Sequence, residues 1–328
     1  MKVIRAGQIF TTLKKEKLKI MNKTIISEFG LDKIGHSQST VEFLNVKLEF
    51  DNLAFLDYNK VLKFASPLTL EMKKSLDAFL NQLFQSVVFN KPNDTRKLLK
   101  GLHESNQTRL GFSSKRPHGN SVGSVLKQLI QDNTEFVINS LKTGQFSYNT
   151  LYFGIDQVGP DRISDIIVSI IKSQLITFTQ EQCTKHRIPT KAIKLRNVFN
   201  YATKSWENGT YDLPVFDGLP IIFIPKKLIS SDSGLVSSYN RFLRYGFTHF
   251  VKNNTEYAFL MDEKNKEKGV KKKDYEAYLK TAHITNKDQV KKWVINNKTA
   301  ILDFESELDP HVIPLSDKEL EEVVNRLN

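Results

Sequence analysis

The sequence contains very little cysteine, since Cys183 is the single one among 328 residues. One cysteine cannot form an intrachain disulfide, and it excludes zinc and iron–sulfur sites that need several thiolates. A reducing compartment fits such a chain best, so we expect a cytoplasmic protein.

Long hydrophobic runs are also missing. The longest apolar stretch, residues 219–225, contains Pro220 and Pro225 and is far shorter than the roughly 20 apolar residues that cross a bilayer. We therefore expect no membrane partner.

Acidic residues are fewer than basic ones: 36 Asp and Glu stand against 48 Lys and Arg, which gives a net charge of +12. The content of 40% hydrophobic and 26% charged residues is typical of a folded protein. The charge excess favours a polyanionic partner, and nucleic acid, either DNA or RNA, is the partner we expect.

The hydrophobic patterns predict a helix-rich α+β fold. Apolar runs predict a mixed sheet built from strands near residues 41–57, 151–155 and 192–224. Helical spacing follows Ser66 and Pro67 up to Val88, and a single long helix is expected over residues 162–186.

Charge and composition divide the chain into four segments. Residues 1–23 form a basic leader or extension, and residues 24–260 form the main α+β domain. Residues 261–273 are a Lys-rich linker, and residues 274–328 are expected to form a C-terminal helical appendage. Capping boxes that begin at Thr285 and Ser316 support helices in this last segment.

Residues 110–124 have the most unusual local composition, because glycine, serine and basic residues precede a predicted helix. Backbone N–H groups, hydroxyls and cations at a helix start can bind a phosphate, although the spacing is neither that of a Walker A loop nor that of a Rossmann turn. An exposed loop without a ligand is the alternative. The candidate nucleic-acid contacts are Ser113, Ser114, Lys115 and Arg116 here, and Lys271, Lys272 and Lys273 in the linker.

Three carboxylates surround the start of the long predicted helix. Asp161 and Asp165 are one helical turn apart, and Asp156 precedes them by a short loop. Together they form a candidate catalytic site, in which Asp161 and Asp165 would hold Mg²⁺ or Mn²⁺. We favour the alternative, in which Asp161 caps the helix and Asp165 complements its dipole.

Two further patterns are typical of nucleases. The strand-like run before Asp262 and Lys264 ends in Asp-x-Lys, which is the second half of a restriction-type nuclease signature and needs a partner carboxylate. Arg244 and His249 match the Arg-x4-His spacing of a class of small helical ribonucleases. A solvated linker and chance spacing are the alternatives.

The order of four short segments resembles a family of bacterial proteins associated with anti-phage defence loci. These segments are Leu110–Ser113, Asp161–Asp165 leading to Phe178–Gln180, Asn200–Trp206 with Leu213–Pro214, and Ile224–Lys227. The similarity covers roughly residues 24–305. Longer members continue into a restriction-type nuclease core with a carboxylate-x-Lys motif. The resemblance implies a role in antiviral defence, with nucleic acid as the target and cleavage supplied by another subunit of the defence system.

The expected function is therefore that of a nucleic-acid-binding component of a defence system, either non-catalytic alone or dependent on a partner. A metal-dependent nuclease and a protein–protein adaptor are the two alternatives. The nuclease would need a divalent cation such as Mg²⁺ or Mn²⁺.

Overall fold

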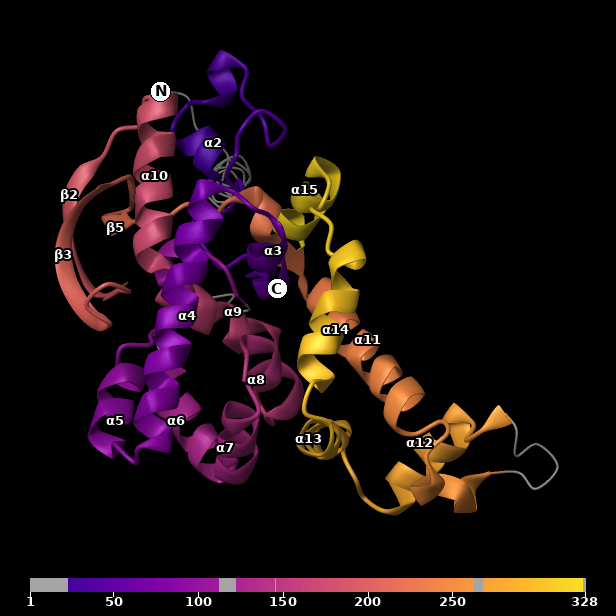
Figure 1. The fold of residues 1–328 in the computed structure, drawn as a ribbon. Coiled ribbons are helices and arrows are strands. Elements are labelled where there is room, and N and C mark those ends of the chain that lie inside the picture. Colours follow the sequence, from indigo (N-terminus) through magenta and orange to yellow (C-terminus); the bar gives the residue numbers. More distant parts are fainter. Residues whose placement is uncertain (1–22, 112–121, 145, 262–267, 327–328) are drawn as a thin grey trace, which may run out of the picture.

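A computed structural model describes residues 23–111, 122–144, 146–261 and 268–326 (Figure 1). Helices dominate, so the expected helix-rich α+β class is confirmed. The helices are α2 (Ile25–Glu28), α3 (Tyr58–Lys63), α4 (Pro67–Val88), α5 (Pro92–Lys100), α6 (Val122–Asp132), α7 (Thr134–Lys142), α8 (Tyr148–Gly154), α9 (Pro160–Ile170), α10 (Lys172–His186), α11 (Asp232–Phe250), α12 (Lys272–Thr281), α13 (Asn286–Asn296), α14 (Ala300–Leu308) and α15 (Asp317–Asn325).

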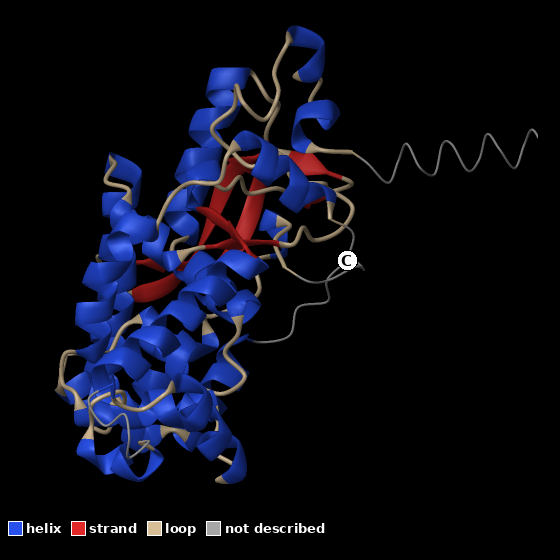
Figure 2. Cartoon of the chain, turned by 90° about the vertical axis from the view of Figure 1, so that its right-hand side faces the viewer, coloured by secondary structure: helices blue, strands red, loops and turns tan. Residues whose placement is uncertain are grey.

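In the described residues the strands form three separate antiparallel pairs rather than the expected mixed sheet, and Figure 2 shows how small they are beside the helices. The pairs are β1 (Ala54–Leu56) with β6 (Ile229–Ser231), β2 (Lys191–Asn200) with β3 (Ser205–Leu213), and β4 (Val215–Phe216) with β5 (Leu219–Pro220). The hairpin of β2 and β3 curves around α10, which runs beside α4 through the middle of the body (Figure 1).

The predicted strand over residues 41–50 is wrong. Its alternating pattern is present, but the segment forms only isolated bridges, Phe43 with Pro225 and Lys47 with Thr24, and the side chain of Asn52 binds part of its backbone. The Asn52 Oδ1 atom accepts from the Lys47 amide at 3.0 Å, and its Nδ2 atom donates to the Lys47 carbonyl at 3.0 Å. Side-chain amides that satisfy the backbone in this way compete with sheet pairing.

Of the apolar residues 151–155, predicted as a strand, Leu151–Gly154 belong to helix α8 and Ile155 is its C-cap. Ser147 caps this helix through a capping box with Thr150, and every residue of the helix is buried. A short run that is buried on all sides has no hydrophobic periodicity, so the sequence pattern cannot separate helix from strand.

The long helix predicted over residues 162–186 is two helices, because the chain turns at Ile171 between α9 and α10. The helix predicted after Ser66 is confirmed as α4, with Pro67 in its first turn and a capping box between Ser66 and Thr69. The capping boxes at Thr285 and Ser316 are confirmed as the starts of α13 and α15.

Polar side chains attach the C-terminal helices to the body, and two of them act on helix α8. Lys287 of α13 donates to the carbonyls of Tyr152 at 3.1 Å, Val158 at 3.0 Å and Ile155, all near the end of α8. Glu305 of α14 accepts from Ser147 and Asn149 at the start of α8. Helix α8 is therefore held at both ends by helices that follow it by more than 100 residues.

Candidate functional site

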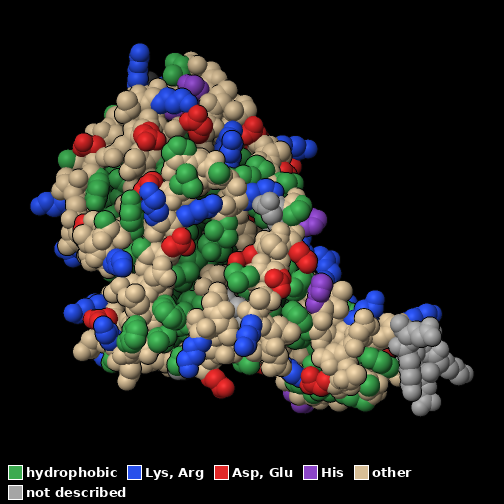
Figure 3. Space-filling view, in the orientation of Figure 1, with side chains coloured by type: hydrophobic (Ala, Val, Ile, Leu, Met, Phe, Trp, Pro, Cys, Tyr) green, Lys and Arg blue, Asp and Glu red, His purple; other side chains and the backbone are tan. Residues whose placement is uncertain are grey.

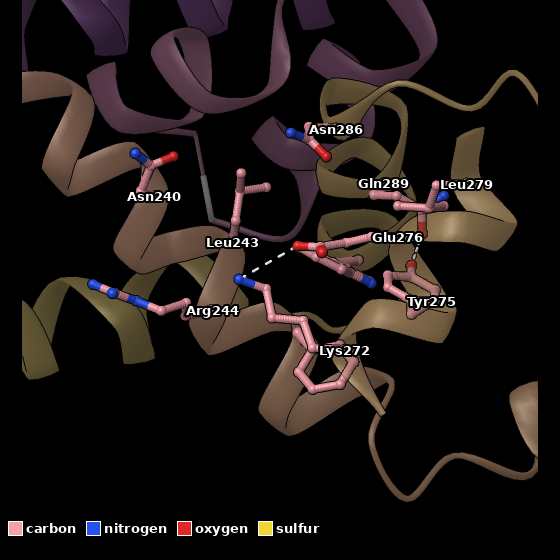
Figure 4. A pocket seen from close by; sticks show the side chains of 11 residues that line it. Asn240, Leu243, Arg244, Lys272, Tyr275, Glu276, Leu279, Asn286 and Gln289 are labelled. Carbon is pink, nitrogen blue, oxygen red and sulfur yellow. Dashed lines mark hydrogen bonds and ion pairs between the residues drawn. The ribbon is translucent and has the colours of Figure 1, made fainter. Parts of the chain in front are cut away.

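A cleft of about 360 Å³ opens between α11, α12 and α13 (Figure 4). The exposed residues at its mouth are polar or charged, and the buried residues at its inner wall include Leu279 and Trp293. The lining residues are Asn240, Leu243, Arg244, Phe247, Lys272, Tyr275, Glu276, Leu279, Asn286, Gln289 and Trp293. A cleft of this size and mixed lining is suited to a small ligand or to part of a larger one.

Close packing of two helices builds the inner wall of this cleft. Gly246 of α11 lies against the Trp293 indole, and a Cβ atom at position 246 would come within 2.3 Å of it. Tyr275 of α12 donates its hydroxyl hydrogen to the Gln289 amide oxygen of α13. The missing side chain at Gly246 thus lets α13 approach α11 closely enough to bury Trp293.

The indole N–H of Trp293 is buried, and no hydrogen-bond acceptor for it lies within the described parts of the chain. The residue is only 4% exposed. Trp206, the other tryptophan, differs in this respect, because its N–H donates to the Leu98 carbonyl at 2.8 Å. An indole nitrogen only donates, so the partner that Trp293 lacks among the described residues is a hydrogen-bond acceptor.

The mouth of the cleft carries positive charge. Lys272 pairs with Glu276 one turn along the same helix, α12, with 3.4 Å between Nζ and Oε1, and Arg244 of α11 is exposed at the cleft (Figure 4). Two basic residues, Arg244 and Lys272, line the cleft itself. The surrounding segment, residues 240–298, contains 14 Lys and Arg against 7 Asp and Glu, and this excess is more than half of the net charge of the protein. In Figure 3, Lys and Arg side chains lie along the upper edge of the lower-right part of the molecule, where Figure 1 places α12.

The predicted nucleic-acid contacts fall into two groups. Lys271, Lys272 and Lys273 are exposed at the start of α12, next to the cleft. The other candidates, Ser113, Ser114, Lys115 and Arg116, lie outside the described residues. So do Asp262 and Lys264 of the Asp-x-Lys pattern. The apolar run before them is a 3-10 helix (Thr255–Leu260) and not the predicted strand.

Asp161 and Asp165 lie together on α9, close to two acidic residues that the sequence pattern did not indicate. Burial and then the charge of Glu104 raise the pKa of Asp161 to about 6. Burial and then the charge of Asp161 raise the pKa of Asp165 to about 8, with Glu104 and Asp51 adding to the effect. Asp51 and Glu104 are far from α9 in the sequence, so only the fold brings these four carboxyls near one another.

The capping role favoured for Asp161 is wrong. The cap position of α9 is Gly159, with no side-chain cap hydrogen bond, and Asp161 lies inside the helix after Pro160. Asp156, the third predicted carboxylate, is exposed and pairs with Lys291 of α13 at 3.3 Å. Its charge does not contribute to the raised pKa of Asp161 or of Asp165.

The loop with the unusual composition starts beside this acidic pair. Gly111 has a φ of +130°, and a Cβ atom there would lie 3.1 Å from an Asp161 carboxylate oxygen. Glycine is therefore favoured at the point where this loop begins beside Asp161.

Within the described residues, no group of three or more His, Cys, Asp or Glu side chains is placed to hold a metal ion. We expect about 5 mM MgCl₂ or MnCl₂ to leave the Tm of the protein unchanged, because a cation stabilises only the state that binds it. Thermal shift with wild type and Asp165→Asn measures this. A rise with metal in wild type that is absent in the variant would support the metal-dependent nuclease.

Arg244 and His249 do not share a site. Arg244 lines the cleft, whereas the His249 ring packs on Tyr245 with 4.3 Å between ring centroids and does not line it. Cys183 is buried in α10, and burial raises the pKa of its thiol to about 12, which leaves no thiolate at neutral pH.

Fold and site together define a helix-rich α+β protein with an acidic pair in its body and a basic cleft among its C-terminal helices. Residues 33–237 match the model of a family described as a domain of unknown function (DUF8370). The match covers more than half of the chain, so the protein belongs to this family. The acidic pair lies within the match, and all residues that line the cleft follow it.

No curated protein and no solved structure matches the chain. None of the described helices is long and apolar enough to cross a membrane.

Proposed function

We propose that this protein is a nucleic-acid-binding component of a bacterial anti-phage defence system, and that it binds the phosphate backbone through residues 240–298. The observation that carries the proposal is the concentration of positive charge around the cleft of α11, α12 and α13. Lys271, Lys272, Lys273 and Arg244 are all exposed there.

Contacts of this kind bind phosphates by charge and release counterions from the nucleic acid. They position the protein without reading sequence, because sequence is read from base edges. Cleavage, where it occurs, is assigned to another subunit, in keeping with the resemblance to defence-locus proteins.

Affinity for nucleic acid is expected to fall steeply with salt. Fluorescence anisotropy with a labelled oligonucleotide of about 20 nucleotides, at about 50 and 200 mM NaCl, measures it. The double variant Lys271→Gln/Lys273→Gln is expected to raise Kd on the order of tenfold and to reduce the salt slope, because two phosphate contacts are lost.

The matched control is Lys33→Gln/Lys318→Gln, which removes the same charge from exposed positions outside residues 240–298. It should bind like wild type. Equal losses in both double variants would show that net charge alone drives binding. No binding at low salt would contradict the proposal and favour the protein–protein adaptor.

A further inference from the structure

The cleft of α11, α12 and α13 has features that phosphate contacts alone do not explain. We propose that it holds one unpaired nucleotide of a bound strand, with the phosphate at the basic mouth and the base directed at the Trp293 N–H. This inference rests on the proposed function and names its substrate class: single-stranded nucleic acid, or an unpaired strand end.

Trp293 is the first reason. A buried donor without an acceptor costs free energy, and the cost is recovered when a ligand supplies the acceptor. The same chain shows what a purely structural tryptophan does, since Trp206 donates to the Leu98 carbonyl. Trp293 is 4% exposed and lines the cleft, and a group bound in the cleft is the source that we propose for this acceptor.

The amide side chains around Trp293 are the second reason. Asn240, Asn286 and Gln289 line the cleft from two helices. The Gln289 oxygen is engaged by Tyr275, which leaves its amide hydrogens as donors. Nucleobases present carbonyl oxygens and ring nitrogens that accept such bonds, together with donors that asparagine oxygens can accept.

The charge at the mouth is the third reason. Lys272 and Glu276 form an ion pair whose side chains are 54% and 61% exposed, and such pairs contribute little. A phosphate can therefore take Lys272 from Glu276 at small cost. A base in a duplex has its pairing edge engaged and stays in the stack, so the cleft favours unpaired nucleotides.

The test compares three labelled probes of about 20 nucleotides: oligothymidylate, a duplex of the same length, and an abasic deoxyribose-phosphate strand of the same charge. Oligothymidylate is expected to bind on the order of tenfold more tightly than the other two. Trp293→Phe keeps a ring against Gly246 but removes the N–H. It should weaken binding of oligothymidylate roughly fivefold and leave the abasic strand unaffected.

Trp206→Phe is the matched control, and it should bind all three probes like wild type. This variant also leaves Trp293 as the only tryptophan. The fluorescence of Trp293 is expected to change when oligothymidylate binds and to stay constant when the abasic strand binds. Asn240→Ala, an exposed substitution at the mouth, provides a second test if Trp293→Phe does not fold, with weaker binding of oligothymidylate as the expected result.

Equal affinity for the three probes, with no effect of Trp293→Phe or Asn240→Ala, would overturn the nucleotide site and leave backbone binding in place. Failure of every probe to bind at low salt would overturn this inference and the proposed function together.

Discussion

Asp165→Asn is expected to raise the free energy of unfolding by roughly 2–3 kcal/mol near pH 7.5. The pKa of Asp165 is raised to about 8 in the folded protein, from an ordinary value of 3.8. Each unit of difference between the folded and unfolded pKa corresponds to about 1.4 kcal/mol, and we take about half of the full value because solvent and relaxation reduce it. The variant replaces this carboxyl by an amide that never ionises.

The same shift sets the direction of the pH dependence. Between about pH 4 and pH 8 the folded state holds the Asp165 proton while the unfolded state releases it, so stability falls as pH rises through this window. Asp161, whose pKa is raised to about 6, adds to the fall up to that pH. Urea unfolding at several pH values should show a smaller fall for Asp165→Asn than for wild type.

Asp156→Asn is the control for this prediction, because Asp156 is exposed and its pair with Lys291 contributes little. Its stability should stay within about 0.5 kcal/mol of wild type. If Asp165→Asn were destabilising and the stability of wild type increased with pH, the Asp165 carboxylate would be charged and held by a cation.

Gly246→Ala is expected to destabilise the protein on the order of 3 kcal/mol. Alanine favours a helix by about 1 kcal/mol over glycine, but its Cβ atom would lie 2.3 Å from the Trp293 indole. Relief of this overlap requires α13 to move away from α11, and overpacking of this kind costs typically 1–3 kcal/mol or more. Chemical denaturation measures the change, and loss of nucleic-acid binding at the cleft should accompany it.

Gly234→Ala in the same helix is the matched control. A Cβ atom there would meet its nearest neighbours at 3.5 Å, which is ordinary contact. We expect no loss of stability and a gain of up to about 1 kcal/mol. The double variant Gly246→Ala/Trp293→Phe should recover part of the loss, since a smaller ring leaves room for the methyl group. Equal stabilities of the two alanine variants would contradict the packing described for Trp293.

The local signals that were predicted well are those in which the deciding contacts lie a few residues apart. The capping boxes that start α4, α13 and α15 are examples. In each, the side chain of the N-cap residue accepts from the backbone N–H three residues later; these N-cap residues are Ser66, Thr285 and Ser316. The helical spacing after Ser66 also predicted the extent of α4 up to Val88. These features need no knowledge of the rest of the chain.

The errors arose where a distant residue decides the local structure. Asn52 binds the backbone of Lys47 and also that of Arg109, at 2.9 Å. Residues 41–50 therefore form isolated bridges to Thr24 and Pro225 and no continuous strand. Residues 151–154 were predicted as a strand although they belong to α8, every residue of which is buried. Periodicity records one buried face, and it carries no information when every face is buried.

By itself, the sequence determined that this is a helix-rich α+β protein with one cysteine, no long apolar run and an excess of positive charge. Each of these follows from composition or from contacts within one helical turn. Only the tertiary structure decided that Asp51 and Glu104 join Asp161 and Asp165 while Asp156 does not. It alone placed Trp293 against Gly246 with its N–H unsatisfied beside Lys272. The physical reason is that a pKa shift, a buried donor or a cleft depends on which side chains surround a group and keep water away from it. These side chains come from distant parts of the sequence, and the packing of the helices brings them together.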